Sequence, residues 1–207
     1  ILTENTTPTN ASGGSWKWSK VIDGTVAYPI GPVTSAVARL QNTNFDTNWL
    51  FFGTGRYFFE NPPTGTSTTP EIDDADGQRR LFGIKDPCFI SGTINPTYCA
   101  TVPPINFSAL TNVTNISSVP TESNANLSGF KGWYINLDGS STIGTTSTYF
   151  TYDNVTRPYR AERVITDPLA TTSGVVFFTT YKPYADECAL GGKSFLWALR
   201  YNTGNAP

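Results

Sequence analysis

The chain has 207 residues, a formal net charge of -2 and no histidine. Its length is sufficient for one domain with a buried core, and its charge gives no basis for binding nucleic acid or an anionic membrane. Without histidine, the chain cannot use Ser-His-Asp hydrolysis or histidine-ligated zinc or haem. No apolar stretch approaches the roughly 20 residues that span a bilayer. Abundant aromatic, β-branched, Gly and Pro residues favour strands joined by turns.

The first part of the chain alternates polar stretches with short apolar runs. Residues 1–15 are rich in Thr, Asn, Ser and Gly and are expected to be a flexible N-terminal segment. The alternation WKW at 16–18 predicts a half-buried strand. Buried strands are predicted over NWLFFGTGRYFFE at 48–60 and RRLFGIKDP at 79–87. The chain opens on ILTENTTP and contains no Met, as expected of a processed secreted chain or a piece of a larger one.

Two stretches lack strand patterns and are predicted to be polar surface insertions. Residues 60–77 are turn-forming throughout, and residues 89–128 are dominated by Thr, Asn, Ser and Pro. Loops this long without a core of their own are usually surface excursions that carry function. Strand patterns resume with GWYINLDG at 132–139 and continue with GVVFFTTYKP at 174–183 and FLWALRYNTG at 195–204.

The apolar runs repeat one layout. Residues 50–54 (LFFGT) and 81–86 (LFGIKD) form one unit, and residues 176–180 (VFFTT) and 196–201 (LWALRY) form a second. In each unit, an apolar run that ends in small or polar residues precedes a strand of the form Leu-aromatic-small-aliphatic-basic. This relation is typical of adjacent strands in a propeller blade. The alternative is two unrelated hairpins in a β-sandwich.

Six segments follow one another from Trp49 to Gly204: WLFFGTGRYF, LFGIKD, GWYINL, ERVITDPL, GVVFFTTYKP and CALGGKSFLWALRYNTG. Together they resemble the C-terminal β-propeller domain of the PilC/PilY family, secreted tip adhesin and assembly proteins associated with type IV pili. The resemblance implies an all-β fold, a partial quinoprotein-like β-propeller of two to three blades over residues 16–207. A blade takes roughly 40–50 residues and closure needs about four blades or more. The remaining part of the propeller, or an N-terminal region of the same precursor, is therefore an expected partner.

The three cysteines are Cys88, Cys99 and Cys188. Cys88 and Cys99 bracket a short loop rich in Pro, Gly, Thr and Ser, which favours a local disulfide. The alternative is two buried thiols in a reducing compartment. If the local disulfide forms, Cys188 is either free or paired with a cysteine outside this chain.

The family resemblance also implies a calcium-binding loop of alternating carboxylates. The weak candidates here are Asp73, Asp74 and Asp76. A calcium loop continues with further oxygen ligands and a late bidentate acid, whereas this one continues with Arg79 and Arg80. A solvated acidic turn is the simpler interpretation, so no metal or other cofactor is expected, with calcium as the one open possibility.

Other charged residues have structural explanations. Glu162 and Arg163 are interpreted as an ion pair that anchors a blade, rather than as acid–base machinery. Asp86 and Asp138 each end a strand pattern before Pro or Gly and are predicted to form turns. No catalytic or cofactor-binding residue is expected, and the chain is predicted not to be an enzyme.

The resemblance implies a non-enzymatic, extracellular protein of the bacterial cell surface that acts in pilus assembly, in adhesion at the pilus tip, or in both. Expected partners are pilins, minor pilins and a surface ligand, with no nucleic acid and no membrane span. The insertions 60–77 and 89–128 are the candidate contact surface, because rigid strands present variable loops. Two alternatives stay open: a fragment of a quinone-dependent dehydrogenase propeller, and a structural subunit of an extracellular filament or layer.

Overall fold

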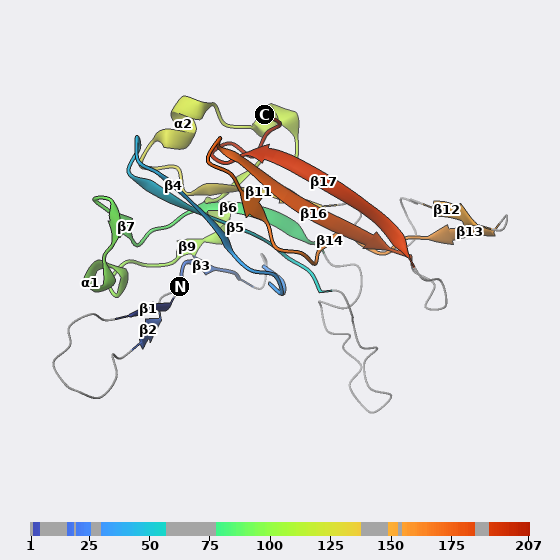
Figure 1. Ribbon diagram of the computed structural model, residues 1–207, viewed down its shortest axis with the longest axis horizontal. Helices are drawn as coiled ribbons and strands as arrows, with labels where there is room; N and C mark the ends of the chain where they lie inside the picture. The colour runs from blue at the N-terminus through green and yellow to red at the C-terminus, as the bar shows by residue number, and fades with distance from the viewer. Residues whose placement is uncertain are drawn as a thin grey trace.

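The computed structural model is built mainly from strands, with a few short helices, which confirms the predicted all-β class (Figure 1). The structure describes residues 2–4, 16–18, 20–25, 30–56, 78–137, 149–152, 155–184 and 191–207. Within these residues, the strands form neither a closed barrel nor a closed propeller. The predicted insertion 60–77 lies outside the described residues.

The first sheet has five strands, in the order β10 (Thr111–Asn112), β11 (Gly132–Asn136), β6 (Arg80–Lys85), β5 (Thr47–Gly53) and β4 (Ala38–Asn42). Neighbours are antiparallel except β10 and β11, which are parallel. Strand β5, which lies between β6 and β4, is buried on both faces, as its continuous apolar run predicts. The pairing of β5 with β6 confirms the first predicted strand pair.

The second sheet has four strands: β14 (Arg163–Val164), β15 (Leu169–Ala170), β16 (Val175–Pro183) and β17 (Gly192–Arg200). β16 pairs with β14 and β15 along one edge and with β17 along the other. The pairing of β16 with β17 confirms the second predicted strand pair. Buried and half-buried residues alternate along β16, so one of its faces is turned to the core.

The remaining elements are short. The strand pairs are β1 (Leu2–Glu4) with β2 (Trp16–Trp18), β3 (Ile22–Asp23) with β9 (Ile105–Asn106), β7 (Phe89–Ile90) with β8 (Thr93–Ile94), and β12 (Tyr149–Tyr152) with β13 (Val155–Pro158). The helices are α1 (Pro96–Cys99), η1 (Phe107–Ala109), η2 (Ile116–Ser118) and α2 (Glu122–Asn126). The predicted strand at 16–18 is present, but its partner β1 comes from the segment that was expected to be flexible.

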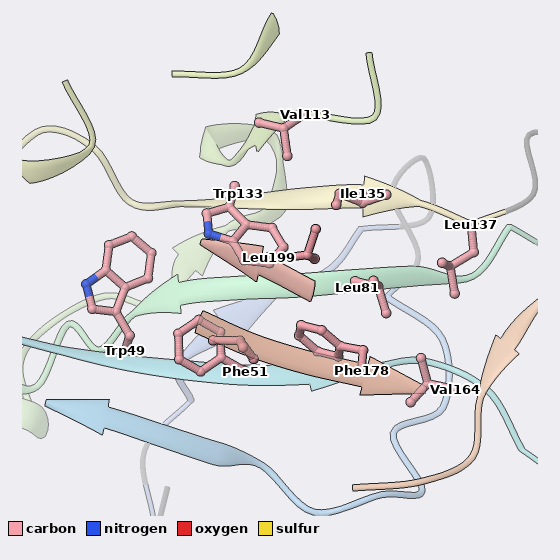
Figure 2. Packing of buried hydrophobic residues seen from close by; sticks show 11 residues of the cluster. Trp49, Phe51, Leu81, Val113, Trp133, Ile135, Leu137, Val164, Phe178 and Leu199 are labelled. Atoms are coloured by element: carbon pink, nitrogen blue, oxygen red, sulfur yellow. The ribbon is translucent and has the colours of Figure 1, made fainter. Parts of the chain in front are cut away.

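The main core lies between the two sheets, where aromatic rings from the first meet aliphatic and aromatic side chains from the second (Figure 2). Trp49 and Phe51 extend from β5, and Trp133 extends from β11. The ring of Trp133 meets the ring of Phe178 on β16 edge-on, with 6.5 Å between centroids. Such pairs add to the burial free energy of large aromatic residues.

A second core covers the opposite face of the first sheet. Phe52 and Phe82 stack with 4.9 Å between ring centroids, and Phe107 packs edge-on against Phe82. Ile105 and Leu110 complete this cluster. The interpretation of 89–128 as an excursion without a core therefore needs correction, because this segment buries three of those side chains and adds strand β10 to the sheet. Its apolar residues are isolated among polar ones and follow no strand or helix period, so the sequence pattern did not reveal them.

The two sheets approach most closely where β5 ends. A methyl group at Gly53 would overlap the side chain of Val164 on β14, and one at Gly55 would lie 2.5 Å from Cβ of Arg163. Val164 N also donates a hydrogen bond to Thr54 O, at 3.0 Å. The glycines thus allow backbone-to-backbone contact between the sheets.

Replacing Gly53 with Ala tests whether the two sheets lie this close together. We expect Gly53→Ala to lower the free energy of unfolding by about 1–3 kcal/mol, because the added methyl overpacks the space held by Val164. The control is Gly129→Ala, where a methyl would meet nothing within 4 Å, and it should change stability by less than about 0.5 kcal/mol. Urea unfolding followed by tryptophan fluorescence measures both, and equal stabilities would contradict the close approach.

Candidate interaction surfaces

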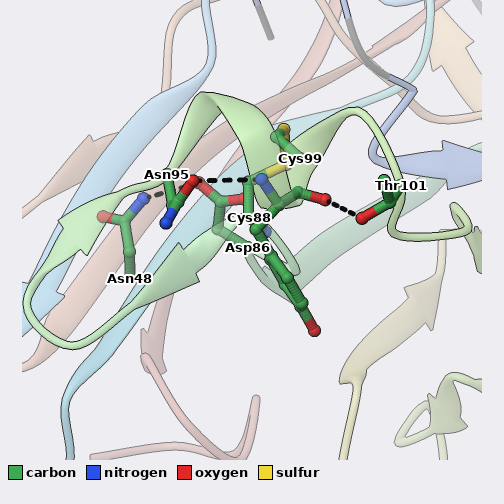
Figure 3. Close-up of a disulfide and its surroundings, with 7 residues drawn as sticks. Asn48, Asp86, Cys88, Asn95, Cys99 and Thr101 are labelled. Atoms are coloured by element: carbon green, nitrogen blue, oxygen red, sulfur yellow. Dashed lines mark hydrogen bonds between the residues drawn. A yellow bond between two sulfur atoms is a disulfide. The ribbon is translucent and has the colours of Figure 1, made fainter.

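A disulfide closes the loop that follows strand β6 (Figure 3). Cys88 and Cys99 are bonded, with 4.7 Å between their Cα atoms, as the spacing predicted. Both are buried, and the bond ties strand β7 and helix α1 together. Cys188 lies outside the described residues, so its state stays a prediction.

A buried hydrogen-bond network holds the start of this loop. Asp86 Oδ1 accepts a hydrogen bond from Cys88 N at 2.9 Å, and Asp86 Oδ2 accepts one from Asn48 Nδ2 at 3.0 Å. Asn48 Oδ1 in turn accepts from Arg39 Nε at 2.7 Å. The prediction that Asp86 forms a turn is confirmed, and Asn48 is a partner that sequence reasoning missed because it lies 38 positions away.

The other end of the loop is held by local bonds around the single turn of α1. Asn95 Oδ1 accepts from Tyr98 N at 3.0 Å, and Asn95 O accepts from Cys99 N at 2.8 Å. Thr101 Oγ1 donates to Tyr98 O at 2.9 Å (Figure 3). Hydrogen bonds hold both ends of the loop and the disulfide closes it. The backbone that carries the ring of Tyr98 is therefore constrained.

Beside this loop is a hollow of about 370 Å³, here called the disulfide hollow. Its lining includes Phe45, Asp46, Asp86, Tyr98, Phe130 and Lys131. Phe45 is 49% exposed and Tyr98 is 40% exposed. A volume of this size, with aromatic and charged groups together, suits recognition of a polar ligand or of one side chain of a partner protein. Tyr98 lies within the segment 89–128 that the sequence predicted as a contact surface, but the sequence did not place Phe45 or Phe130 at the same hollow.

Lys85 lies on one wall of the hollow. Its Nζ atom donates to Leu127 O at 2.9 Å and lies 5.6 Å from the Trp49 ring and 5.5 Å from the Phe130 ring. Desolvation, and then the charge of Lys131, lower the pKa of Lys85 from 10.5 to about 8. The hollow therefore contains an ammonium group that loses its proton close to physiological pH.

The buried carboxylate of Glu162 lies between the sheets. It accepts hydrogen bonds from Thr180 Oγ1 and from Trp197 Nε1, the latter at 3.2 Å. Arg163, which was interpreted as its ion-pair partner, directs Nε to Ala161 O at 3.1 Å. Neighbouring residues of an extended chain point to opposite sides, which explains why the two side chains find different partners. Glu162 thus links β16 and β17 from inside the core.

The second sheet also has a face turned away from the core, here called the outer face and formed by Leu169, Phe177, Leu196 and Ala198. The register places Leu169 and Ala198 on either side of Phe177, and Leu196 opposite Thr179. Leu169 is 63% exposed and Leu196 is 71% exposed. Contiguous exposed apolar residues of this kind mark contact surfaces.

The predicted metal candidates Asp73, Asp74 and Asp76 lie outside the described residues. In the part of the chain that the structure describes, no three His, Cys, Asp or Glu residues are grouped so that they could hold a metal ion. Among the described helices, none is long and apolar enough to cross a membrane.

Known proteins provide one comparison of fold. No family model matches the sequence, and no curated protein matches it. Among solved structures, the crystal structure of the Pseudomonas aeruginosa PilY1 C-terminal domain is similar to this chain, with 18% sequence identity and a TM-score of 0.48. The similarity covers 86% of this chain and 33% of that one, so this chain spans about a third of the other's length.

Removing the disulfide tests its role in holding the loop. We expect the double substitution Cys88→Ser and Cys99→Ser to lower the free energy of unfolding by about 3 kcal/mol, because the cross-link restricts the unfolded chain. Urea unfolding measures the loss. Reductant should weaken the unsubstituted protein by a similar amount and leave the double variant unchanged. Equal stability of the two proteins without reductant would contradict this role.

The lowered pKa of Lys85 predicts a pH dependence of stability. Between about pH 8 and 10.5, the folded state has released this proton while the unfolded state still holds it, so this group's contribution to stability increases as pH rises. Lys85→Met should remove that contribution. Lys131→Gln should leave part of it, because desolvation is the larger cause of the shift. NMR titration of the lysine side chains measures the pKa directly, and an ordinary value for Lys85 would refute the prediction.

Proposed function

We propose that this chain is a non-enzymatic cell-surface protein of the type IV pilus, part of a β-propeller, that acts in pilus assembly or in adhesion at the pilus tip. One observation carries the proposal. Each of the six segments that resemble the PilC/PilY family covers most or all of one strand of the two sheets: β5, β6, β11, β14, β16 and β17. The resemblance therefore concerns the framework strands, and the sequence between them is free to vary.

The architecture supports a binding role. Two packed sheets form a rigid base, and the disulfide-closed loop presents Tyr98 at the rim of the disulfide hollow. A buried disulfide of this kind persists in oxidising compartments, which fits an extracellular protein. Rigid elements that hold a side chain in place reduce the entropy lost on binding, so the hollow is suited to specific contact with a surface ligand or a minor pilin.

The outer face supports incorporation into a larger assembly. The first sheet is covered on both sides, by the main core and by the second core. The second sheet is covered on one side and exposes Leu169 and Leu196 on the other. Blades of a propeller bury such faces against their neighbours, so the remaining part of the propeller is the partner that we propose for this face.

Pilus association tests the proposal in the bacterium that encodes the chain. We expect an antibody against the chain to detect it in sheared pilus fractions, and deletion of its gene to reduce piliation or adhesion. Detection in the cytoplasm alone, or unchanged piliation and adhesion after deletion, would refute the proposal.

The disulfide hollow can be tested in the same bacterium. Phe45→Ala together with Tyr98→Ala should weaken adhesion about tenfold or more, because exposed aromatic anchors dominate binding energy. The amount of protein on the pili should stay the same. Val33→Ala, a substitution of an exposed apolar residue outside the hollow, is the matched control. Equal adhesion by all three proteins would place the contact surface elsewhere.

A further inference from the structure

Strand β17 is an edge strand along its whole length. All nine of its residues pair with β16, from Arg200 opposite Val175 to Gly192 opposite Pro183. The figure shows it at the margin of the second sheet (Figure 1). A continuous nine-residue edge is long for a protein of this size, since edge strands are usually short, bulged, interrupted by proline or covered.

The hydrogen bonds at Arg200 identify which backbone groups point to the open edge. Arg200 N donates to Asn205 O at 2.8 Å, and Arg200 O accepts from Gly204 N at 2.9 Å, so both groups point away from β16. The direction alternates along a strand, and every second residue therefore directs its N–H and C=O to the same edge. These residues are Ser194, Leu196 and Ala198. No described residue forms a hydrogen bond with the backbone groups of these three on that edge.

Apolar side chains lie on both sides of this row of backbone groups. Leu196, 71% exposed, belongs to the outer face, and Phe195, 42% exposed, points to the other side of the sheet. An added strand would therefore gain main-chain hydrogen bonds and also bury apolar surface on both faces.

The C-terminal turn indicates the direction of such a strand. Residues 201–204 reverse the chain, with Gly204 at a φ of 72°, and bring Asn205 beside Arg200. The chain after the turn therefore lies beside the open edge at Arg200, and an antiparallel strand could continue along that edge from Ala198 towards Gly192. Two-fold pairing with a second copy of the chain, centred on Leu196, is excluded because it would place that copy's Gly192 where Asn205 already lies.

We propose that the open edge of β17 is a strand-addition site that takes one antiparallel strand from the remaining part of the propeller. Only the source of the strand rests on the proposed function, whereas the site itself rests on the backbone geometry. The strand would have apolar residues beside Phe195 and Leu196. It would have an acidic residue opposite Lys193, because opposite charges across strands attract.

Proline at position 196 tests the site without disturbing the sheet. The N–H of Leu196 faces the open edge and makes no bond to β16, so Leu196→Pro removes a donor for the added strand alone. Leu196→Thr is the matched control, since it loses the same side chain and keeps the N–H. Thermal unfolding of both variants establishes that they fold.

The probe is a short fluorescent peptide of valine and threonine that has valine at two consecutive central positions, one for each face, and one glutamate near its C-terminal end. We expect saturable binding to the unsubstituted chain and to Leu196→Thr, measured by fluorescence anisotropy. Binding to Leu196→Pro should be at least about tenfold weaker, through the lost hydrogen bond and the ring's obstruction of the edge. Equal binding by both variants, or no binding to the unsubstituted chain, would overturn the proposal.

Light scattering tests whether a second copy of the chain occupies the edge of β17 instead. A dimer of the unsubstituted chain that Leu196→Pro dissociates, with no peptide binding, would show that a second copy takes the edge and would overturn the proposed source. The peptide assay contains no pili, so its failure leaves the pilus proposal untouched. Conversely, peptide binding by a chain that is absent from pili would refute the proposed function and keep the site.

Discussion

The close approach of β5 to β14 is the constraint on which the rest of the structure depends. Gly53 has no side chain, so Val164 lies directly against the backbone of the first sheet, and Val164 N bonds to Thr54 O. That contact sets the separation and orientation of the two sheets. Trp49, Phe51 and Phe178 then fill the space that results. A larger residue at position 53 would overlap Val164 and force a local shift between the layers, which would weaken their dense packing.

The two sheets on either side of this contact differ in how their far faces are covered. The first sheet has a second core on its far side, supplied partly by Ile105, Phe107 and Leu110 from the long polar segment. That same segment carries the disulfide and Tyr98, so the element that covers one face also forms the wall of the disulfide hollow. The second sheet has no comparable cover over Leu169 and Leu196 among the described residues. One side of the stack is thus covered and carries the disulfide hollow, and the other side exposes Leu169 and Leu196.

Polar groups inside the molecule position these surfaces. Asp86 and Asn48 bond to each other beneath the start of the disulfide loop, which fixes where the loop leaves β6. Glu162 bonds to Thr180 and Trp197 and holds β16 and β17 together from the core side. Buried polar groups with good partners specify one arrangement of strands, because any other would leave a carboxylate or an indole N–H without a partner.

The sequence alone predicted the strands that carry continuous or alternating apolar runs and the pairing of β5 with β6 and of β16 with β17, and it favoured the Cys88–Cys99 bond that the structure contains. These features are local, because they depend on period, turn residues and short separations along the chain. Only the tertiary structure decided the partner of Asn48, the gathering of Phe45, Tyr98 and Phe130 around one hollow, and the burial of Phe107. It also decided which backbone groups of β17 face outwards. Each of these depends on contacts between residues far apart in sequence, and no periodic pattern records such contacts.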